Sequence, residues 1–272
     1  ETENRYYIEN PRGWTMPKRL AVLYDCPYPF IQGGGQKRLF EISQYLLRHD
    51  WEVEWYALKF WEGPDKIKYE GITYNAVGKH TELYDSTGKR RIWETICYGT
   101  MIARHIELRQ FDIILAGQWP LFHLIPARIF SLLGKSKLVV DWWEVWGKEH
   151  WINYFGIKGF FGLLLEKIMS HITSHIIAIT QKGKDQLQDL GVRKDEITFI
   201  PNGIDFEKIS NSNIKAKEFD LVYMGRLKGH KNVDHLVRVV SILKEKGDLV
   251  TLQIIGDGPE RKNLEVLVKK LN

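Results

Sequence analysis

The sequence predicts an α/β protein built around a mostly parallel sheet. Short apolar runs alternate with segments of helical period along the whole chain, which is typical of repeated βαβ units. A glycine-rich turn stands between the first apolar run and the first helical segment, and the alternation restarts after a polar stretch that begins at residue 206. With 272 residues, 44% of them hydrophobic and 27% charged, the composition suits one large or two modest globular domains.

Apolar runs in the first 205 residues are predicted as strands, and the segments of helical period between them as helices. The predicted strands are 19–25, 51–58, 112–117, 137–142, 175–180 and 197–200. The predicted helices are 36–48, 91–109, 121–133, 159–172 and 181–190. The run 51–55 alternates apolar and charged residues, so we expect it nearer an edge of the sheet. The glycine-rich segment 59–89 is interpreted as a long surface excursion with one extra strand at 72–74.

The polar, lysine-rich stretch 206–218 is predicted to link two domains. Ahead of a first domain at 18–205, residues 1–17 are predicted to form an extended arm. The second domain, 219–272, has two strands at 219–225 and 250–256, with helices at 233–246 and 259–271. Because the fraction of surface buried falls with size, about 60 residues in an open parallel sheet are marginal alone. We therefore expect the chain to end inside its second domain.

The formal net charge is +5 and the pI is near 9.0. A basic surface suits an anionic substrate or an anionic membrane surface, or is simply solvated. Nucleic acid is excluded as a partner, because the basic residues are scattered and no nucleic-acid-binding motif is present. Cys26 and Cys97 form neither a disulfide framework nor a zinc motif, and no apolar run reaches the roughly 20 residues of a membrane span. We expect a cytoplasmic protein.

The glycine loop Gly33–Gly35 follows the first predicted strand and precedes the first predicted helix. The first N–H groups of a helix lack partners, and the helix dipole adds about half a positive charge there. This position therefore favours a bound anion such as a phosphate. The alternative is a tight βα turn without a ligand, since the loop is neither a dinucleotide fingerprint nor a P-loop.

Two further glycine turns follow the strands of the second domain. In the first, Arg226 and Lys231 flank the turn before the helix, and a guanidinium and an ammonium both suit phosphate. The alternative is ordinary surface charge, with Asn232 as the N-cap of the helix. The second turn, 256–258, is interpreted as a well-formed βα turn, with Pro259 at the first helical position.

An aromatic and acidic segment, 141–146, follows the strand at 137–142. Carboxyl ends of strands in open α/β sheets face the ligand crevice. Asp141 and Glu144 are therefore candidate catalytic acids or bases, or ligands of sugar hydroxyls. Trp142, Trp143 and Trp146 are candidates for stacking on a sugar, and core packing is the alternative. The apolar run 151–172 is expected to be a core or interdomain helix, with a membrane-surface helix as the alternative.

Four segments in order resemble the GT-B glycosyltransferases, specifically the large retaining family 4 of glycosyl transferases group 1. They are Gly33–Gln36, Ile200–Asp205, Tyr223–Arg226 with Lys231 and Asn232, and Ile254–Pro259. The stretch Asp-Trp-Trp-Glu-Val-Trp-Gly that begins at Asp141 is similar to a branch common in archaea. The resemblance implies a Rossmann-like acceptor-side domain and an incomplete, donor-binding Rossmann-like domain that face each other across a cleft.

The resemblance also implies a function, namely the transfer of a sugar from a nucleotide-diphosphate sugar to an acceptor with retention of anomeric configuration. Gly34 and Gly35 would approach the donor, and Arg226 and Lys231 would hold its diphosphate. Fixed cations offset the charge that grows on the leaving diphosphate, so no metal or other cofactor is expected. The acceptor would be a glycan or a lipid-linked sugar, which suits contact with the inner face of the cell membrane.

The sequence departs from the family pattern at two points. Trp143 occupies the place where family members usually carry a histidine, and the family's Glu-x7-Glu segment is absent from the 272 residues. These departures leave a second hypothesis open, a non-catalytic binding or scaffold subunit. A nicotinamide-dependent oxidoreductase is disfavoured, because both the glycine fingerprint and the acidic residue about 20 positions later are missing.

Overall fold

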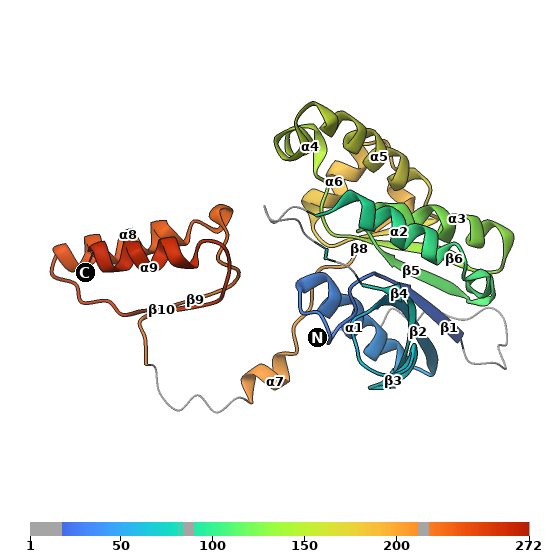
Figure 1. Ribbon diagram of the computed structural model, residues 1–272, viewed down its shortest axis with the longest axis horizontal. Helices are drawn as coiled ribbons and strands as arrows, with labels where there is room; N and C mark the ends of the chain where they lie inside the picture. Colours follow the sequence, from blue (N-terminus) through green and yellow to red (C-terminus); the bar gives the residue numbers. More distant parts are fainter. Residues whose placement is uncertain (1–17, 81, 84–89, 212–217, 272) are drawn as a thin grey trace, which may run out of the picture. The chain divides into compact units, whose positions relative to one another are not determined.

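The computed structural model describes residues 18–80, 82–83, 90–211 and 218–271 of the 272. It divides into two compact units, Glu1–Gly203 and Ile204–Asn272. The predicted arm 1–17, residues 84–89 of the predicted excursion and residues 212–217 of the predicted linker lie outside the described residues. The α/β fold class is confirmed, since both units alternate strands and helices around parallel strands (Figure 1).

The first unit is built on an eight-stranded sheet in the order β3-β4-β2-β1-β5-β6-β7-β8. All neighbours pair in parallel except β3 and β4, which are antiparallel. The parallel strands therefore all end at the same edge. The strands are β1 (Lys18–Leu23), β2 (Trp51–Lys59), β3 (Lys66–Tyr69), β4 (Ile72–Lys79), β5 (Ile113–Gly117), β6 (Lys137–Trp142), β7 (His175–Ala178) and β8 (Ile197–Phe199).

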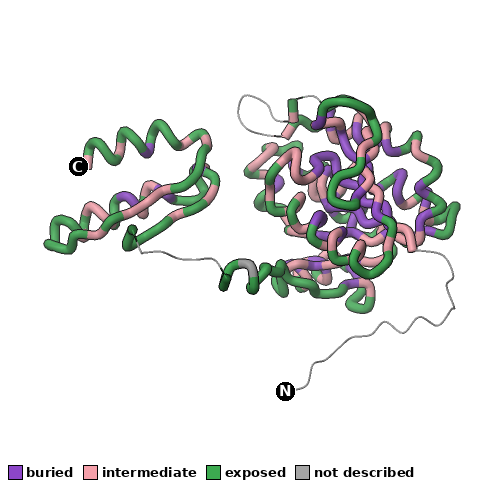
Figure 2. The backbone as a smooth tube through the Cα atoms, turned by 90° about the horizontal axis from the view of Figure 1, so that it is seen from below, coloured by how far each residue is buried: buried purple, intermediate pink, exposed green. Residues whose placement is uncertain are grey.

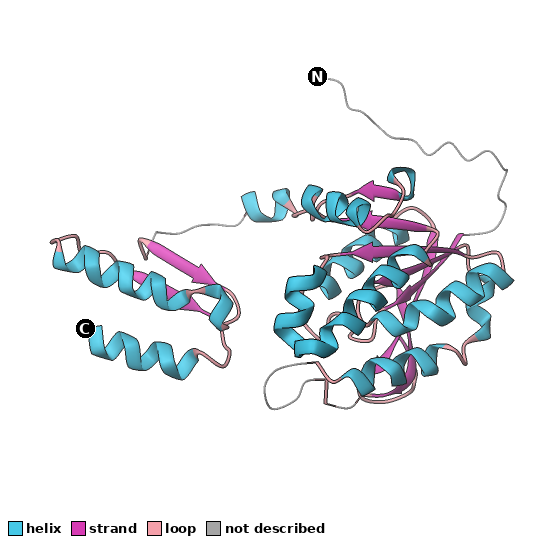
Figure 3. Ribbon diagram, turned by 90° about the horizontal axis from the view of Figure 1, so that it is seen from above, coloured by secondary structure: helices cyan, strands magenta, loops and turns pink. Residues whose placement is uncertain are grey.

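Helices cover both faces of this sheet (Figure 3). On one face, α1 packs Leu39 and Phe40 against Val22, Trp55 and Tyr74. Because strand side chains alternate between faces, the neighbours of Val22 point into a second core, which the remaining helices cover. The helices are α1 (Gly34–Leu47), α2 (Ile92–Ile102), α3 (Leu124–Leu133), α4 (Gly147–Phe155), α5 (Gly159–His171) and α6 (Gln181–Asp189), with 3-10 turns η1 (Ile106–Gln110), η2 (Leu121–His123), η3 (Gly156–Lys158) and η4 (Lys194–Glu196).

The predicted edge position of the run 51–55 is wrong. β2 lies inside the sheet, between β1 and β4. Its charged residues are tolerated because they pair across the sheet: Arg19 Nη2 of β1 donates to Glu54 Oε1 at 3.0 Å. The alternation of apolar and charged residues therefore does not require an edge position, because the charged residues are paired with a neighbouring strand.

The surface excursion predicted at 59–89 is also wrong for its described part. The extra strand expected at 72–74 is present and extends to Lys79 as β4, in which Ile72 and Tyr74 are fully buried. The glycine-rich composition reflects a hairpin instead, because Glu70 and Gly71 both have positive φ, 45° and 83°, in the turn between β3 and β4.

The helix predicted at 91–109 ends at Ile102, and η1 follows it. Buried side chains at Glu94, Tyr98 and Ile102 keep a spacing of four, but the next buried residue is Leu108. That step of six breaks the helical phase. The sequence prediction also missed α4, which places Trp151 in the core.

The second unit is small. It contains α7 (Phe206–Ser210), β9 (Leu221–Met224), η5 (Gly229–Lys231), α8 (Val233–Glu245), β10 (Leu252–Ile255) and α9 (Arg261–Leu271). β9 and β10 are parallel, and their core centres on Leu227, Val233, Val237 and Leu264. Figure 2 shows few buried positions there, compared with the dense buried strands of the first unit.

In the second unit α8 begins at Val233 as predicted, whereas α9 begins two residues later than predicted. Pro259 is not the first helical residue, because α9 begins at Arg261 and Glu260 N–H bonds to Leu227 O at 3.1 Å. Asn232 does stand at the N-cap of α8, but its side chain makes no capping bond. It has φ 51°, a left-handed conformation that asparagine tolerates better than most residues.

Candidate functional site

The candidate site of the first unit lies where the parallel strands end. β1 leads to the glycine loop, β5 to Gln118 and β6 to Trp143 and Glu144. These strands are neighbours in the order β1-β5-β6, so the residues that follow them gather at one edge of the sheet. This arrangement matches the expectation that the segment after 137–142 lies at the carboxyl edge of the sheet.

Helix α1 begins inside the glycine loop, at Gly34, with Gly33 as an extended N-cap. Lys37 N–H bonds back to Gly33 O at 3.0 Å, so the N–H groups of Gly34, Gly35 and Gln36 belong to the first turn, which has no intrahelical acceptors. No acidic side chain stands in that turn to cap it. The helix therefore begins in the loop as the sequence predicted, and the binding of an anion there stays a prediction.

The two glycines expected to approach a donor have different surroundings. A Cβ added at Gly35 would lie 2.4 Å from the Trp143 ring, whereas a Cβ at Gly34 would meet nothing within 4 Å. Gly35 is therefore required by its contact with Trp143. Gly34 leaves open space above the helix terminus, so of the two it is the one with room for a ligand.

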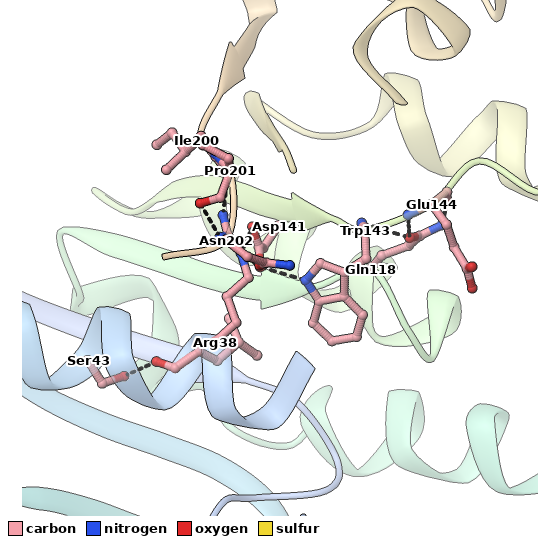
Figure 4. Close-up of polar contacts among 10 residues, drawn as sticks. Arg38, Ser43, Gln118, Asp141, Trp143, Glu144, Ile200, Pro201 and Asn202 are labelled. Atoms are coloured by element: carbon pink, nitrogen blue, oxygen red, sulfur yellow. Dashed lines mark hydrogen bonds and ion pairs between the residues drawn. The ribbon is translucent and has the colours of Figure 1, made fainter. Parts of the chain in front are cut away.

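Arg38 ties this helix to two other segments (Figure 4). Its Nε donates to both carboxylate oxygens of Asp141, at 3.1 and 2.9 Å. Its two terminal nitrogens donate to the carbonyl oxygens of Ile200 and Pro201 at 2.9 and 3.0 Å, and to Asn202 Oδ1 at 3.1 Å. The planar guanidinium thus fixes α1, the end of β6 and the segment after β8 in one network.

Gln118 holds the segment that follows β6. It is fully buried, its Nε2 donates to Glu144 O at 2.6 Å, and its Oε1 accepts from Trp143 N–H and Glu144 N–H, both at 3.1 Å (Figure 4). One side chain therefore satisfies three backbone groups of two consecutive residues. This rigid backbone positions the side chains of Trp143 and Glu144 at the edge of the sheet.

The structure places the two candidate acids differently. Asp141 is fully buried, and its Oδ2 also accepts from Trp143 Nε1 at 2.6 Å. Both of its oxygens are engaged by Arg38, so its direct role is to hold that network. Glu144 is exposed and accepts from Trp146 Nε1 at 2.7 Å. Of the two carboxylates, Glu144 is the one that solvent reaches.

The three candidate tryptophans also differ in their exposure to solvent. The predicted sugar contact of Trp142 is wrong, because its side chain is 2% exposed and lies in the main core. Strand alternation explains this, since Asp141 and Trp142 point to opposite faces of β6. Trp143 and Trp146 are partly exposed. The Trp143 ring packs edge-on against Tyr24 at 5.1 Å, and Trp146 packs against Trp119 at 4.8 Å.

Asp25 and His123 are two further buried polar residues of the first unit. Asp25, which follows β1, is buried and forms an ion pair with Arg90. His123 is fully buried, and its Nδ1 contacts the carbonyl oxygen of Pro120. Burial lowers the pKa of His123 to about 4, so this imidazole is neutral near pH 7.

In the second unit, the predicted phosphate-binding pair lies in the turn between β9 and α8. Arg226 and Lys231 are both exposed, and their side chains make no hydrogen bond or ion pair within the described part of the chain. The turn 256–258 packs closely against the backbone of this loop. A Cβ at Gly256 would lie 1.9 Å from Gly225 O, and one at Gly258 would lie 2.4 Å from Leu227 O. The turn 256–258 is therefore structural, as interpreted from the sequence.

Within the residues that the structure describes, no group of three or more His, Cys, Asp or Glu side chains could hold a metal ion. No helix formed by those residues combines the length and apolar content needed to cross a bilayer.

The open parallel sheet with a glycine loop at its first βα turn, followed by a second βαβα unit, defines the GT-B class of glycosyltransferase folds. Within that class, the chain belongs to Glycosyltransferase Family 4. The model of that family matches residues 32–208, and the model of glycosyl transferases group 1 matches residues 205–272. The predicted resemblance is thus confirmed at the level of class and family.

Solved structures share this fold at low sequence identity. HepE of Anabaena in complex with UDP is 17% identical, with a TM-score of 0.62 over 93% of this chain and 66% of HepE. TarM of Staphylococcus aureus with fondaparinux, alpha-GlcNAc-glycerol and UDP is 10% identical, with a TM-score of 0.59 over 94% of this chain and 76% of TarM.

A curated relative is the capsular polysaccharide biosynthesis glycosyltransferase CapM of Staphylococcus aureus. It is 32% identical over 115 residues, which cover 37% of this chain and 30% of CapM. The chain therefore aligns with about a third of that relative and spans about two thirds of HepE.

Sequence reasoning missed Arg38 and Gln118. Gln118 directly follows the predicted strand 112–117, so the rule that pointed to the segment after 137–142 would also have found it. Arg38 lies four residues after Gly34 on the predicted helix. Its only sequence signal is an arginine one turn into the helix, which is more often a solvent-exposed residue.

Proposed function

We propose that the protein is a glycosyltransferase that takes a sugar from a nucleotide-diphosphate sugar and transfers it to an acceptor with retention of anomeric configuration. The observation that carries the proposal is the pair Arg226 and Lys231 in the turn between β9 and α8, two exposed cations whose side chains no other described residue binds by a hydrogen bond or an ion pair. Membership of Glycosyltransferase Family 4 supports it.

The chemistry needs groups that stabilise a leaving nucleoside diphosphate. Negative charge grows on the diphosphate oxygens as the glycosidic bond breaks, and preorganised cations and N–H groups offset it. Arg226 offers a fork that fits two phosphate oxygens, and Lys231 offers a mobile point charge. The open helix terminus at Gly34 is the second phosphate-suited group. In this proposal no metal ion is needed for the leaving group.

The ligands named for structural relatives support a nucleotide-sugar donor. HepE has been solved with UDP, with UDP and glucose, and with UDP-glucose. TarM has been solved with UDP together with a glycan and a glycosylated glycerol. We propose a glycan or a lipid-linked sugar as the acceptor of this protein. At the sheet edge, Glu144 is the candidate acid or base, Trp143 and Trp146 are the candidate stacking groups, and Asp141 holds Trp143 in place.

Calorimetric titration with UDP tests the donor assignment, using the complete protein that the gene encodes. Replacing Arg226→Ala and Lys231→Ala together should weaken UDP binding about 100-fold or more, because each of the two charged hydrogen bonds contributes roughly 1.5–3 kcal/mol. The matched control is Lys262→Ala with Lys270→Ala, which removes the same charge from exposed positions of α9. Equal affinities for the two double variants would contradict the assignment.

Retention is tested separately, by the anomeric configuration of the product in NMR spectra. A product of inverted configuration would remove this part of the proposal and leave the donor assignment intact. Addition of a chelator should leave the transfer rate unchanged, and its loss would show that a metal ion takes part.

A non-catalytic binding subunit is the second candidate, favoured by Trp143 in place of the usual histidine. Trp143 fills the space beside Gly35 and Gly117, where a smaller side chain would leave room. The two candidates differ in turnover. Release of nucleotide from a panel of nucleotide sugars in the presence of a glycan acceptor supports the enzyme, whereas UDP binding without release supports the binding subunit.

A further inference from the structure

An open cavity of about 570 Å³ lies at the edge of the large sheet where its parallel strands begin. α3 and the segments at the starts of β6 and β7 contribute the residues that line it. Trp143 and Glu144 lie at the opposite edge, where the same strands end. Lys137 and Trp142 are the first and last residues of β6, and five steps of about 3.3 Å separate them by roughly 16 Å. We name this feature the amino-edge cavity, and it is separate from the candidate site.

Polar side chains make up most of the lining of the amino-edge cavity. Three of them are basic, three are serines, and a single valine accompanies them. Because the lining of most small-molecule sites is predominantly apolar, this composition indicates a polar ligand. The six polar residues are Arg128, Lys137, His175, Ser131, Ser136 and Ser174.

Two cations of the cavity carry donor groups that no described residue uses. Arg128 Nη1 donates to Ser174 Oγ at 2.9 Å, and its Nε and Nη2 have no partner among the described residues. The side chain of Lys137 is exposed and makes no hydrogen bond or ion pair with them. Since Ser174 Oγ accepts from Arg128, its own proton is available for a further acceptor. The guanidinium, the ammonium and the hydroxyl can therefore all donate to one ligand.

The other polar groups of the lining are held by bonds to the protein. Ser131 Oγ donates to Ser136 O at 2.8 Å, and Ser136 Oγ donates to Leu108 O at 2.6 Å. His175 Nε2 lies 2.7 Å from Thr198 Oγ1 of the neighbouring strand β8. These bonds fix the turn before β6 and the start of β7, so the donors that surround the cavity stand on rigid segments.

Among the described residues, no acidic side chain lines the cavity. Asp112 is near Lys137, whose N–H donates to Asp112 O at 2.9 Å, but the Oδ2 of this aspartate accepts from Arg19 N–H on β1 at 2.8 Å. Glu196 precedes β8, beside His175 of β7, and is not part of the lining. The free donors of Arg128 and Lys137 thus meet no carboxylate inside the cavity.

We propose that the amino-edge cavity binds a small molecule that carries a phosphate group, namely a phosphate monoester. Unused charged donors without an acid favour a ligand that is an anionic acceptor. The donors come from α3, β6 and β7, so they approach the ligand from several directions. This arrangement suits the tetrahedral oxygens of a phosphate better than the two coplanar oxygens of a carboxylate.

The volume of the cavity favours an ester over the free phosphate ion. Sites for small molecules typically measure about 300–1,000 Å³, and a cavity of about 570 Å³ leaves room for an organic group beside the phosphate. The proposal does not depend on the glycosyltransferase activity, because the cavity and the candidate site lie at opposite edges of the sheet.

Calorimetric titration tests the proposal. The protein carries Arg226→Ala and Lys231→Ala in every titration, so that the cations of the second unit do not contribute. The probes are ribose 5-phosphate, inorganic phosphate and, as a neutral match, ribose. We expect ribose 5-phosphate to bind, inorganic phosphate to bind more weakly, and ribose not to bind.

Two matched double variants locate the binding. Arg128→Gln with Lys137→Gln removes two positive charges from the cavity, and Arg48→Gln with Lys68→Gln removes the same charge from exposed positions of the first unit. The first pair should weaken binding about 30-fold, because a charged hydrogen bond from half-buried Arg128 contributes about tenfold and exposed Lys137 about threefold. The second pair should bind ribose 5-phosphate as tightly as the protein without it.

The single change Lys137→Gln guards against a loss of folding, because this exposed side chain makes no contact that the fold needs. It should weaken binding about threefold by itself. Circular dichroism checks that all variants are folded.

Three results would overturn the proposal. Neither phosphate compound could bind at concentrations up to about 10 mM, or the two double variants could lose affinity equally, which would indicate general charge attraction. Inorganic phosphate could also bind as tightly as ribose 5-phosphate, which would remove the ester and assign the cavity to the free ion. Each of these results would leave the donor assignment of Arg226 and Lys231 intact, because both cations are absent from every titration.

Discussion

Arg38 Nε lies 2.9 Å from Asp141 Oδ2, and the Asp141 side chain has no exposure to solvent. The same guanidinium reaches Ile200 O and Pro201 O. An arginine that stands in the first turns of α1 therefore fixes the strand end that carries Trp143, as well as the segment by which the chain leaves β8. The glycine loop at the start of α1 is held in position by this network.

Replacing Arg38→Ala should destabilise the first unit by about 3–5 kcal/mol, because it leaves a buried carboxylate without its charge partner. Urea unfolding followed by fluorescence measures the loss. Arg48→Ala, at an exposed arginine just after the same helix, should change the stability by less than about 0.5 kcal/mol. Adding Asp141→Asn to Arg38→Met should recover part of the loss, since no charge is then buried. An Arg38→Ala protein as stable as the Arg48→Ala control would rule out this account.

Gly35→Ala should lower the stability of the protein, whereas Gly34→Ala should lower its affinity for UDP. The new Cβ at Gly35 meets the Trp143 ring at 2.4 Å, so we expect a loss of about 1–3 kcal/mol in unfolding free energy. The Cβ at Gly34 meets nothing, so stability should hold while UDP affinity falls if a phosphate approaches there. Thermal unfolding and calorimetry on the same pair of proteins separate the two effects. A destabilised Gly34→Ala protein would contradict this assignment of roles.

Glu144→Gln should separate chemistry from folding. Glu144 is exposed, so its neutral isostere should fold as before. If it transfers a proton at the acceptor, the rate of nucleotide release by the complete protein should fall about 100-fold or more. Asp141→Asn should instead lower stability, because its buried carboxylate is bound to Arg38 and to Trp143 Nε1. An unchanged rate of nucleotide release for Glu144→Gln would show that Glu144 is not the catalytic acid or base.

His123 should make stability depend on pH. Burial lowers its folded pKa to about 4, whereas an unfolded histidine has a pKa of about 6.5. Between these values the unfolded chain binds more protons. Stability from this group is therefore complete above pH 6.5, falls as the pH drops toward 4, and the total loss is about 3 kcal/mol.

Urea unfolding at several pH values between 4 and 7 measures this slope for the unchanged chain and for His123→Asn. The asparagine amide can donate to Pro120 O as Nδ1–H does, but it does not titrate. We expect a flatter profile for His123→Asn and an unchanged one for His49→Gln, at an exposed position. Equal slopes for the unchanged chain and His123→Asn would assign the pH dependence to other groups.

The sequence predicted the regular parts of the fold well because buried parallel strands are continuous apolar runs. β1, β5 and β6 lie within one residue of the predicted starts and two of the predicted ends. The failures occurred where a long-range contact replaces a local signal. From the sequence alone, the charge of Glu54 indicates an edge strand. In the structure, Arg19 of the neighbouring strand pairs with Glu54, so the charge is tolerated inside the sheet.

The candidate site was predictable by position but not by role. The rule for strand ends located Asp141, Trp142, Trp143 and Glu144 together. It could not tell which side chains turn inward, because the last residue of a strand still alternates between faces. For this reason the side chain of Trp142 lies in the core and not at the candidate site. Gly35 was expected to serve a ligand, yet its immediate neighbour is Trp143, a contact that spans more than 100 positions.

The two outermost strands of the eight-stranded sheet are both short. β3 has four residues, with Lys66 and Lys68 exposed, and β8 has three. An unpaired strand edge is a template on which other chains can add strands, and short or charged edges oppose this. The hairpin of β3 and β4, part of the segment predicted as a surface excursion, therefore gives the sheet a short, charged edge that opposes the addition of further strands. Lys66→Val with Lys68→Val, which leaves the core untouched, should convert it into a site of fibrillar self-assembly that light scattering would detect.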